Sequence, residues 1–448
     1  MSEAIFGFLS QLDIILWDYI GIIIILFVGV FLTIYSKFFQ FRALFRLRTY
    51  IKDLVACAEK DKQGTHPIKL YFASVGGMVG LGNIVTVVST VTLGGPGSII
   101  WLWVASFLGM LVKYSEVYLG IKYRVKNNEN GFDGGPMYYL RVGFKNKILP
   151  IFVCILLCIY GAEVSQFLII TDTIVNVFSL NNSHIDLNGI KFLYGRYIVI
   201  GLLLTFILLT SVKGVKRFAN VCSAMMPPFM IGYIILGIWI IFDHSADLPD
   251  VFSLIFSSFF DYKSQAGGLI SGGIFLTAHY GVSRAVYSGD IGIGYDSIIQ
   301  SETQTLYPEK QARMSIFALF SDSLICTISI LILLVTGMWQ VKGLQPSEYV
   351  VNALKLYLPN VEYFMVVLFT FAGFTTITGY LVVGQKCAKY LNKKYGQFLY
   401  ILYSIFAFIV FSFYDQEQVI LIMSVSGGIL MVINMLGVFK LRKSIEFL

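Results

Sequence analysis

The chain has 448 residues, of which 57% are hydrophobic and only 13% are charged, and its mean hydropathy is +0.76. Soluble domains carry roughly 25% charged residues, so this composition excludes a soluble globular protein and indicates one that crosses a lipid bilayer several times. The formal net charge of +7 comes from basic loops between apolar segments, and nucleic acid is not an expected partner.

Apolar runs long enough to span a bilayer recur along the whole chain. The fold class is therefore all-α, and the protein is a polytopic membrane protein. The start lacks the basic flank of a signal peptide, so the first run is expected to be retained. Eleven transmembrane helices are predicted, at residues 13–36, 71–93, 98–121, 148–178, 193–212, 219–243, 266–288, 312–338, 360–384, 396–413 and 417–439.

The distribution of Lys and Arg predicts which loops face the cytoplasm. With the N-terminus outside, the inner segments hold 26 of the 33 basic residues and the outer segments hold five. This asymmetry predicts a multi-pass protein of the cell inner (plasma) membrane, with its N-terminus outside and its C-terminus cytoplasmic. The inner segments are 37–70, 122–147, 213–217, 289–311, 385–395 and the C-terminus.

The connector after the first helix alternates bulky apolar residues with Arg and Lys. Phe38, Phe41 and Phe45 stand among Arg42, Arg46 and Arg48, a pattern typical of an amphipathic helix on the anionic inner leaflet. The alternative is a solvated cytoplasmic connector. Together with the first helix it forms an N-terminal unit, residues 1–70.

The apolar run 71–97 is interrupted by glycines at positions 76, 77, 80 and 82. Glycine lowers helix stability and lets the backbone leave helical geometry. One interpretation is a broken helix whose unwound centre binds a small ligand, because free backbone groups at membrane depth must line a cavity. The other is close helix packing, since Gly76 and Gly80 form a small-xxx-small pair.

The remaining ten helices divide into two sets of five, residues 71–245 and 246–448. An odd number per set predicts opposite orientations, so the chain is expected to contain a 5+5 inverted repeat with one extra N-terminal helix. The first helix of the second set, 266–289, is also glycine-rich, with Gly267, Gly268, Gly272, Gly273 and Gly281. Interrupted helices in corresponding positions favour two broken helices around a transporter's midplane site.

Signatures of other functions are absent from the sequence. It contains no GxxxxGK[ST] phosphate loop, and its four histidines are scattered, so neither an ATP-driven pump nor a metal cluster is predicted. Residues 289–296, GDIGIGYD, are expected to be a flexible helix exit. No nucleophile and base converge, and no ring of polar residues predicts a channel. The protein is not expected to be an enzyme or to carry a cofactor.

The first break predicts its own chemistry. Where a helix restarts, its unpaired N–H groups attract a carboxylate, and Leu81 and Gly82 would supply them. The carbonyls before the break suit a cation that prefers oxygen ligands. Thr375 and Thr376 offer two hydroxyls at membrane depth as partners for that cation, although helical threonines often bond only their own i−4 carbonyl.

Other intramembrane polar residues have less specific predictions. Asn83 is expected to orient the unwound backbone rather than bind a second ion. Lys113 and Glu116 are spaced to pair on one helix face. Glu163 and Asp172 lie near expected helix bends or ends and could relay protons. All of these positions are read from the chain.

Several segments resemble the alanine-or-glycine:cation symporter family (sodium:alanine symporters) of the leucine-transporter-like superfamily: FASVGGMVGLGNIVTV, the block 94–124, GGPMYYL, GVSRAVYSGDIGIG and FTTITGYLVVGQK. The resemblance implies a five-plus-five fold and a sodium site. It assigns that site to backbone oxygens of Gly76, Val79 and Ala372 and the hydroxyls of Thr375 and Thr376, and it places Gln166 at the substrate. The chain departs from the family pattern at Leu81, where Thr is usual, and at 288–292.

The sequence therefore predicts a symporter that imports a small neutral amino acid, alanine or glycine in L or D form, with Na⁺ as coupling ion. The alternatives are a proton-coupled transporter of the same fold or a carrier for another amino acid such as glutamine. Charged amino acids should be poor substrates, because no unpaired counter-charge is evident beside either break. The candidate substrate-binding residues are Met78, Leu81, Gly82, Gln166, Phe275, Thr277, His279 and Tyr280.

Overall fold

The computed structural model describes residues 3–58, 63–128, 130–180, 185–187, 190–192, 194–260, 273–412 and 417–448. Most of these residues are helical, as expected for an all-α protein. The strands in the described part are two short antiparallel hairpins, which pair β1 (Val125–Lys126) with β2 (Phe132–Asp133) and β3 (Ile185–Leu187) with β4 (Ile190–Phe192).

The N-terminal residues form one long apolar helix with a π-helical centre. It consists of α1 (Glu3–Ile14), η1 (Ile15–Gly21) and α2 (Ile22–Tyr35), so it begins earlier than predicted. The basic connector then forms two short helices, α3 (Phe39–Leu44) and α4 (Leu47–Ala58). Both pack against α16. Residues 59–62 lie outside the described part of the chain.

The next segment of the chain contains short helices between the long ones. Proline at the first position marks the start of α5 and α8, where its missing N–H costs nothing. The elements are α5 (Pro67–Met78), η2 (Leu81–Asn83), α6 (Val88–Gly94), α7 (Ser98–Lys122), α8 (Pro136–Phe144), α9 (Ile148–Tyr160), α10 (Val164–Val177), α11 (Tyr194–Ser211) and α12 (Gly214–Asp243).

The remaining chain follows the same plan. Proline again begins α16 and α17. The elements are α13 (Leu248–Phe260), α14 (Gly273–Ser288), α15 (Tyr295–Ile299), η4 (Gln300–Glu302), α16 (Pro308–Val335), η5 (Met338–Gln340), α17 (Pro346–Lys355), α18 (Val361–Leu391), α19 (Gly396–Phe411), α20 (Glu417–Lys440) and η6 (Arg442–Ser444).

Among the described residues, eight helices are long and apolar enough to cross a membrane, and the bent pair 67–78 and 81–94 makes up to nine. Several of them expose large apolar side chains, such as Phe206 on α11, Ile235 on α12 and Phe406 on α19, each about 60% exposed or close to it. Apolar faces of this extent are stable only in contact with lipid or another apolar surface. The chain is a multi-pass membrane protein.

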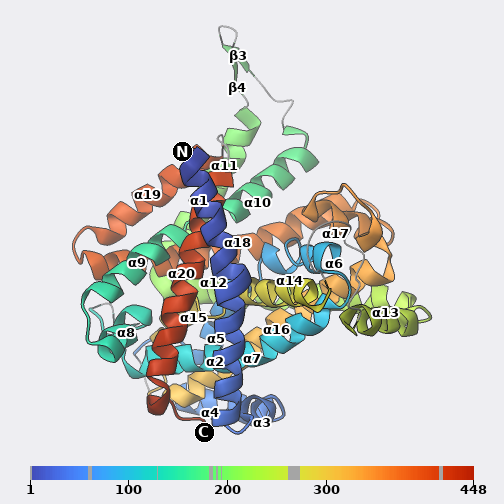
Figure 1. The fold of residues 1–448 in the computed structure, drawn as a ribbon. Helices are drawn as coiled ribbons and strands as arrows, with labels where there is room; N and C mark the ends of the chain where they lie inside the picture. The colour runs from blue at the N-terminus through green and yellow to red at the C-terminus, as the bar shows by residue number, and fades with distance from the viewer. Residues whose placement is uncertain are drawn as a thin grey trace.

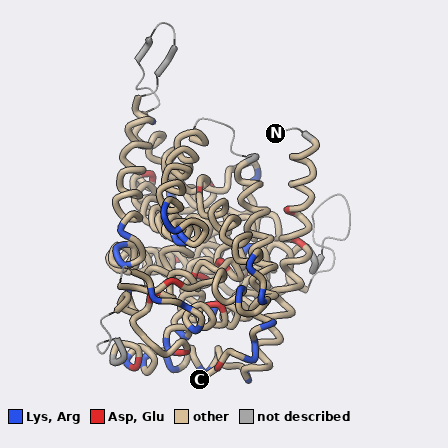
Figure 2. Tube along the Cα trace, turned by 90° about the vertical axis from the view of Figure 1, so that its left-hand side faces the viewer, with Lys and Arg blue, Asp and Glu red and all other residues tan. Residues whose placement is uncertain are grey.

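Helix α7 lies at the centre of the helix arrangement and packs against α14, α16 and α2. The N-terminal helix α1 and the C-terminal helix α20 lie side by side although they are at opposite ends of the sequence (Figure 1). Lys and Arg gather toward the end of the molecule that holds the C-terminus (Figure 2). The elements thus define two ends, one near the start of α1 and one near the end of α20.

Candidate functional site

The first predicted break is present between α5 and α6. Val79 and Gly80 leave helical geometry, with ψ of 84° and −156°, and the chain bends by 58°. Asn83 holds this segment, because its Oδ1 accepts from the Gly80 N–H at 3.1 Å and its Nδ2 donates to Asp322 Oδ1 at 2.6 Å. The unwound backbone and the orienting role of Asn83 are both as predicted.

The structure brings the predicted sodium ligands of α5 and α18 together. Thr376 Oγ1 lies 3.3 Å from the Gly76 carbonyl oxygen and 3.1 Å from that of Ala372, and Thr375 Oγ1 lies 3.0 Å from the Ala372 oxygen. Val79 is the C-cap residue that directly follows α5. The threonines do bond carbonyls of their own helix, but Thr376 also reaches across to α5. Hydroxyl and carbonyl oxygens are the donors that hard cations take.

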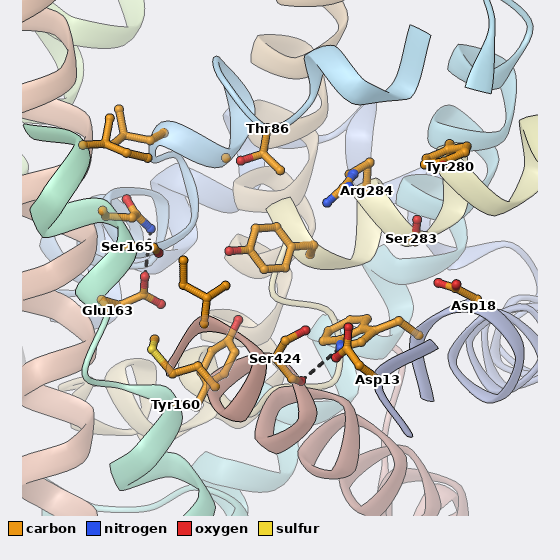
Figure 3. A pocket seen from close by; sticks show the side chains of 18 of the residues that line it. Asp13, Asp18, Thr86, Tyr160, Glu163, Ser165, Tyr280, Ser283, Arg284 and Ser424 are labelled. Carbon is orange, nitrogen blue, oxygen red and sulfur yellow. Dashed lines mark hydrogen bonds between the residues drawn. The ribbon is translucent and has the colours of Figure 1, made fainter. Parts of the chain in front are cut away.

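A cavity of about 360 Å³ opens at the first helix break, where Leu81 and Gly82 line it. Figure 3 shows side chains of α1, α10, α14 and α20 pointing into it. Five of the eight predicted substrate residues line it, namely Leu81, Gly82, Gln166, His279 and Tyr280. The N-terminal helix, which the sequence treats as separate from the site, contributes Asp13, Trp17 and Asp18 to its wall.

A second, smaller cavity of about 20 Å³ lies against both breaks. It shares Gly82, Tyr160, Glu163, Gln166 and Tyr287 with the larger cavity. Its other lining residues are Gly77, Met78, Ser288, Asp290, Thr376 and Tyr380. Met78 is therefore placed here, whereas Thr277 is buried and lines neither cavity. The side chain of Phe275 lies outside the described part of the structure.

The helix 148–178 is interrupted at the same depth. It divides into α9 and α10 at Gly161–Glu163, and Glu163 adopts a left-handed conformation with φ of 44°. The Gln166 amide donates to the Glu163 carboxylate at 3.1 Å (Figure 3). The expected bend near Glu163 is confirmed. The same bend turns a carboxylate and an amide toward the two cavities.

Three glycines of the predicted broken segment 266–289, at positions 267, 268 and 272, lie outside the described residues. The described part of that segment, α14, is continuous through Gly281, where a Cβ would collide with the Ser98 carbonyl of α7. Gly281 is thus a packing residue. The chain unwinds instead after Ser288, and Asp290, Gly292 and Gly294 adopt positive φ before α15 begins.

The segment 289–296 does leave the helix, as predicted, but it is buried and held by hydrogen bonds rather than being an open, flexible stretch. The Asn434 amide donates to the carbonyls of Gly292 and Ile293 at 2.9 and 3.0 Å. Residues 295–301 are fully buried. The glycines here provide the positive φ that the unwound backbone needs.

Lys113 does not pair with Glu116 as the i,i+3 spacing predicts. Its ammonium lies 2.8 Å from Asp296 Oδ2 on α15 and donates to the Asp290 carbonyl at 3.2 Å. Asp296 also accepts from Ser74 on α5 at 2.5 Å. The buried charge of α7 therefore connects the inner parts of both broken helices, a partnership that sequence spacing cannot reveal.

Carboxyl groups lie beside both breaks, although the sequence shows no unpaired counter-charge there. Glu163 and Asp290 are each 5% exposed and line the smaller cavity. At the mouth of the larger cavity, Asp13, Asp18 and Arg284 form a mixed group (Figure 3), with His279 Nε2 3.5 Å from Asp18. Asp172 pairs instead with Arg196 at 2.8 Å.

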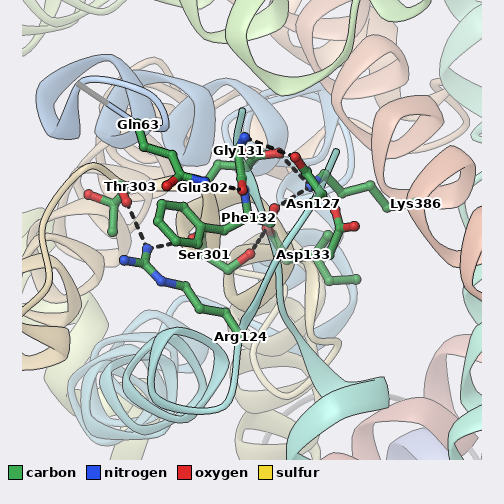
Figure 4. Close-up of polar contacts among 11 residues, drawn as sticks. Gln63, Arg124, Asn127, Gly131, Phe132, Asp133, Ser301, Glu302, Thr303 and Lys386 are labelled. Carbon is green, nitrogen blue, oxygen red and sulfur yellow. Dashed lines mark hydrogen bonds and ion pairs between the residues drawn. The ribbon is translucent and has the colours of Figure 1, made fainter. Parts of the chain in front are cut away.

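Polar contacts link several elements at the opposite end of the helix arrangement (Figure 4). Lys386 of α18 contacts Glu302 at 2.6 Å and Asp133 at 2.9 Å. Arg124 donates to the carbonyls of Ser301, Thr303 and Thr305. Burial alone would raise the pKa of Asp133, but the Lys386 ammonium outweighs it and holds that pKa below its usual value.

Residues 2–446 match the family model described as "Sodium:alanine symporter family". An uncharacterized transporter of Haemophilus influenzae is 31% identical, covering 98% of this chain and 94% of that protein. The sodium/alanine symporter AgcS of Methanococcus maripaludis is 28% identical over 86% and 83% of the two chains. The probable sodium/glutamine symporter GlnT of Bacillus subtilis is 26% identical over 98% and 88%.

Solved structures show the same fold at low identity. A nucleobase-cation-symport-1 family transporter aligns with a TM-score of 0.53 and 11% identity, over 80% of this chain and 75% of that chain. MhsT in complex with L-phenylalanine aligns with a TM-score of 0.52 and 15% identity, over 82% and 88%. With a family model that covers nearly every residue, the chain belongs to the sodium:alanine symporter family.

Proposed function

We propose that this chain is a secondary active symporter that imports a small neutral amino acid, alanine or glycine, together with Na⁺. The observation that carries the proposal is the meeting of Thr375, Thr376 and Ala372 of α18 with Gly76 at the first helix break, next to a cavity between two breaks. Membership of a transporter family, not an enzyme class, supports the same function.

Substrate binding follows from the polarity of the two breaks. The carboxylate would meet the N–H groups of Leu81 and Gly82, where a helix restarts and presents partial positive charge. The amine would face Gln166 and the carboxylates of Glu163 and Asp290, which line the smaller cavity. Met78 and Leu81 would limit side-chain size, because Met78 lines the smaller cavity and Leu81 the larger one.

The two ends of the molecule support an alternating-access cycle. The larger cavity lies toward the N-terminus, while the Lys386–Glu302–Asp133 contacts close the other end. With the N-terminus outside, as the distribution of basic residues favours, this arrangement is open to the exterior and closed to the cytoplasm. The ion pairs of Lys386 would then form the inner gate.

The described residues contain nine apolar spans when the bent pair is counted as one, and adding α14 and α19 gives the predicted eleven. We propose the corresponding division into an N-terminal unit, 1–70, and inverted repeats over 71–245 and 246–448. The broken elements α5–α6 and α14–α15 would be their first helices.

Uptake of labelled alanine and glycine into proteoliposomes, with and without an inward Na⁺ gradient, tests the function. The paired substitution Thr375→Ala and Thr376→Ala should abolish Na⁺-dependent uptake and leave insertion unchanged. Uptake by the unmodified protein that ignores Na⁺ would contradict the proposed coupling.

Proton coupling is a second candidate because Glu163 and Asp290 are buried at the substrate cavity. It predicts uptake driven by a pH gradient without Na⁺ and lost in Glu163→Gln. Glutamine is the alternative substrate, and competition with labelled alanine distinguishes it from glycine. The competition assay also tests the proposed recognition. If arginine or glutamate displaced labelled alanine better than glycine did, a small neutral substrate bound by its carboxylate at the helix end would be contradicted.

A further inference from the structure

A large cavity of about 630 Å³ lies at the opposite end of the molecule from the substrate cavity. It is formed where the β1–β2 hairpin and helices α8 and α9 meet the end of α18. Under the proposed orientation, this position is at the cytoplasmic surface of the membrane. The cavity shares no lining residue with the cavities between the helix breaks.

The lining of this cavity is strongly basic. Its single carboxylate, Asp133, is already paired with Lys386 at 2.9 Å. The six cations of the lining are Lys126, Arg141, Lys147, Lys386, Lys389 and Lys393. An enclosed concentration of one sign of charge focuses its field and attracts an ion of the opposite sign.

Most of these cations are not used by the fold. Within the described residues, Lys126, Arg141, Lys147 and Lys393 form no ion pair with a carboxylate. Lys147 also stands at the N-cap of α9, where the helix dipole disfavours a positive charge. The general excess of basic residues on one membrane side does not require that they converge on a cavity.

An apolar surface begins at the edge of the same cavity. Ile151 lines the cavity and is also 44% exposed on the outer face of α9. Ile148, Phe152 and Ile155 extend that exposed face along the helix, which is part of the span 148–177. A ligand that enters here would meet positive charge at one end and lipid-facing apolar side chains along its length.

We propose that this cavity binds the phosphate headgroup of an anionic phospholipid of the inner leaflet, with its acyl chains along α9. Basic pockets between transmembrane helices on the cytoplasmic side suit such headgroups. The site rests on the proposed orientation of the chain but not on the identity of the transported amino acid. Because Lys386 and Asp133 belong both to this lining and to the inner contacts, a bound headgroup would lie directly beside the proposed inner gate.

The test measures lipid retention. The purified full-length protein, in nanodiscs of equal phosphatidylglycerol and phosphatidylethanolamine, would be transferred to detergent and analysed by native mass spectrometry. We expect phosphatidylglycerol to be retained in preference to phosphatidylethanolamine. The triple variant Arg141→Gln, Lys147→Gln, Lys393→Gln should weaken its retention by about a hundredfold, at about fivefold per charge removed.

The matched control removes three exposed cations of the same membrane side that do not line this cavity, by Lys213→Gln, Lys216→Gln and Lys443→Gln. Retention in this variant should equal that of the unmodified protein. Equal loss in both variants would overturn the proposal, because it would indicate diffuse attraction to anionic membranes. Equal retention of both lipids by the unmodified protein would overturn it as well.

A soluble competitor separates a lipid from a free phosphate ester. Glycerol 1-phosphate at millimolar concentration should leave the retained phosphatidylglycerol in place, because it lacks the chains that contact α9. Complete displacement would reject the lipid site in favour of a soluble anion. Unchanged thermal unfolding of the triple variant in lipid-free detergent would show that lost retention is not lost folding. None of these measurements depends on transport. A negative result for the lipid site can therefore be distinguished from a negative result for the proposed symport.

Discussion

Gly80 stands where a side chain has no room. A Cβ built there would lie 2.6 Å from Thr376 Oγ1 and 2.9 Å from Gln166 Oε1, so the glycine lets the backbone approach the proposed sodium and substrate residues together. The residue is in an extended conformation that any amino acid can adopt. Its requirement for glycine is therefore one of space and not of backbone dihedral angles.

Gly80→Ala should displace the Thr376 hydroxyl and the Gln166 amide without breaking the fold. Overpacking of this kind costs about 1–3 kcal/mol. At this site we expect that free energy to appear as weaker Na⁺ binding, so that the Na⁺ concentration for half-maximal uptake rises by about tenfold or more.

Gly201→Ala and Gly232→Ala are the controls, since nothing lies within 4 Å of a Cβ at either position. Both should transport normally. If Gly80→Ala also kept the Na⁺ dependence of the unmodified protein, the placement of the ion beside Thr376 would have to be abandoned.

Glu163 presents a charge to the substrate cavity that the sequence suggests only indirectly. If its carboxylate helps to bind the amine, Glu163→Gln should weaken alanine binding by about tenfold, the usual loss for a hydrogen bond to a charged group. Scintillation proximity binding with labelled alanine measures this loss. Wild-type affinity in the variant would indicate that Glu163 serves only to orient Gln166.

At the scale of elements, the helix breaks show how far the sequence could lead. The clustered glycines around Gly80 predicted the first break, because those glycines stand at the point where the backbone unwinds. Gly281, which the sequence groups with the glycines of the second break, serves contact with α7 instead, and the described chain unwinds after Ser288. Glycine composition alone does not distinguish a packing residue from an unwound one, and only the neighbouring helix settles which it is.

Side-chain partners between distant elements were harder to predict than the elements. Lys113 was assigned to Glu116 by spacing within one helix, whereas its partner Asp296 lies far along the chain. The N-terminal helix stands outside the two predicted sets of five helices, yet its Asp13 and Asp18 line the larger cavity. Both misses depend on tertiary packing, which local periodicity does not record.

The Lys113–Asp296 pair should act as a unit that holds α7 to α15. Lys113→Met would leave the Asp296 charge buried without its main partner, a change that typically costs about 3–5 kcal/mol. The double variant Lys113→Met, Asp296→Asn removes both charges and should recover much of that loss.

Thermal unfolding in detergent, monitored by size-exclusion chromatography, would compare the variants. A double variant no more stable than Lys113→Met alone would show that the two charges are not coupled. Asp172→Asn serves as a control, because the Asp172 side chain is 45% exposed and its pair with Arg196 is partly solvated, so the expected change is small.

The contacts of Lys386 should control which end of the molecule is open. Lys386→Gln would remove two ion pairs at the closed end and increase accessibility from the cytoplasmic side. Labelling of Thr378→Cys by a permeant thiol reagent would report it, and unchanged labelling would argue against a gate there.

This inner contact is not expected to respond to pH in the physiological range. The folded-state pKa of Asp133 is lowered, so its stabilising charge is present above its unfolded value and is lost only as pH falls toward the folded one. Between about pH 5 and pH 8 the pair stays ionised.

At the scale of the whole molecule, the asymmetry of basic residues predicts an orientation that can be tested directly. In a background without native cysteines, Asp247→Cys should react with an impermeant thiol reagent from outside, and Lys394→Cys should not. Reversed labelling would overturn the orientation and, with it, the assignment of the basic cavity to the inner leaflet. Both residues are exposed in the structure.

The position of Trp17 gives the molecule a built-in optical reporter. The chain has five tryptophans, and among the described residues only Trp17 lines the larger cavity. Its indole N–H donates to the Ser424 carbonyl, and the centre of its ring lies 6.4 Å from that of Tyr287. Closure of that cavity around a substrate would change the water around the indole and therefore its emission. Substrate binding could then be followed by fluorescence in unlabelled protein, and Trp17→Phe, which keeps the other four tryptophans, should lose the change.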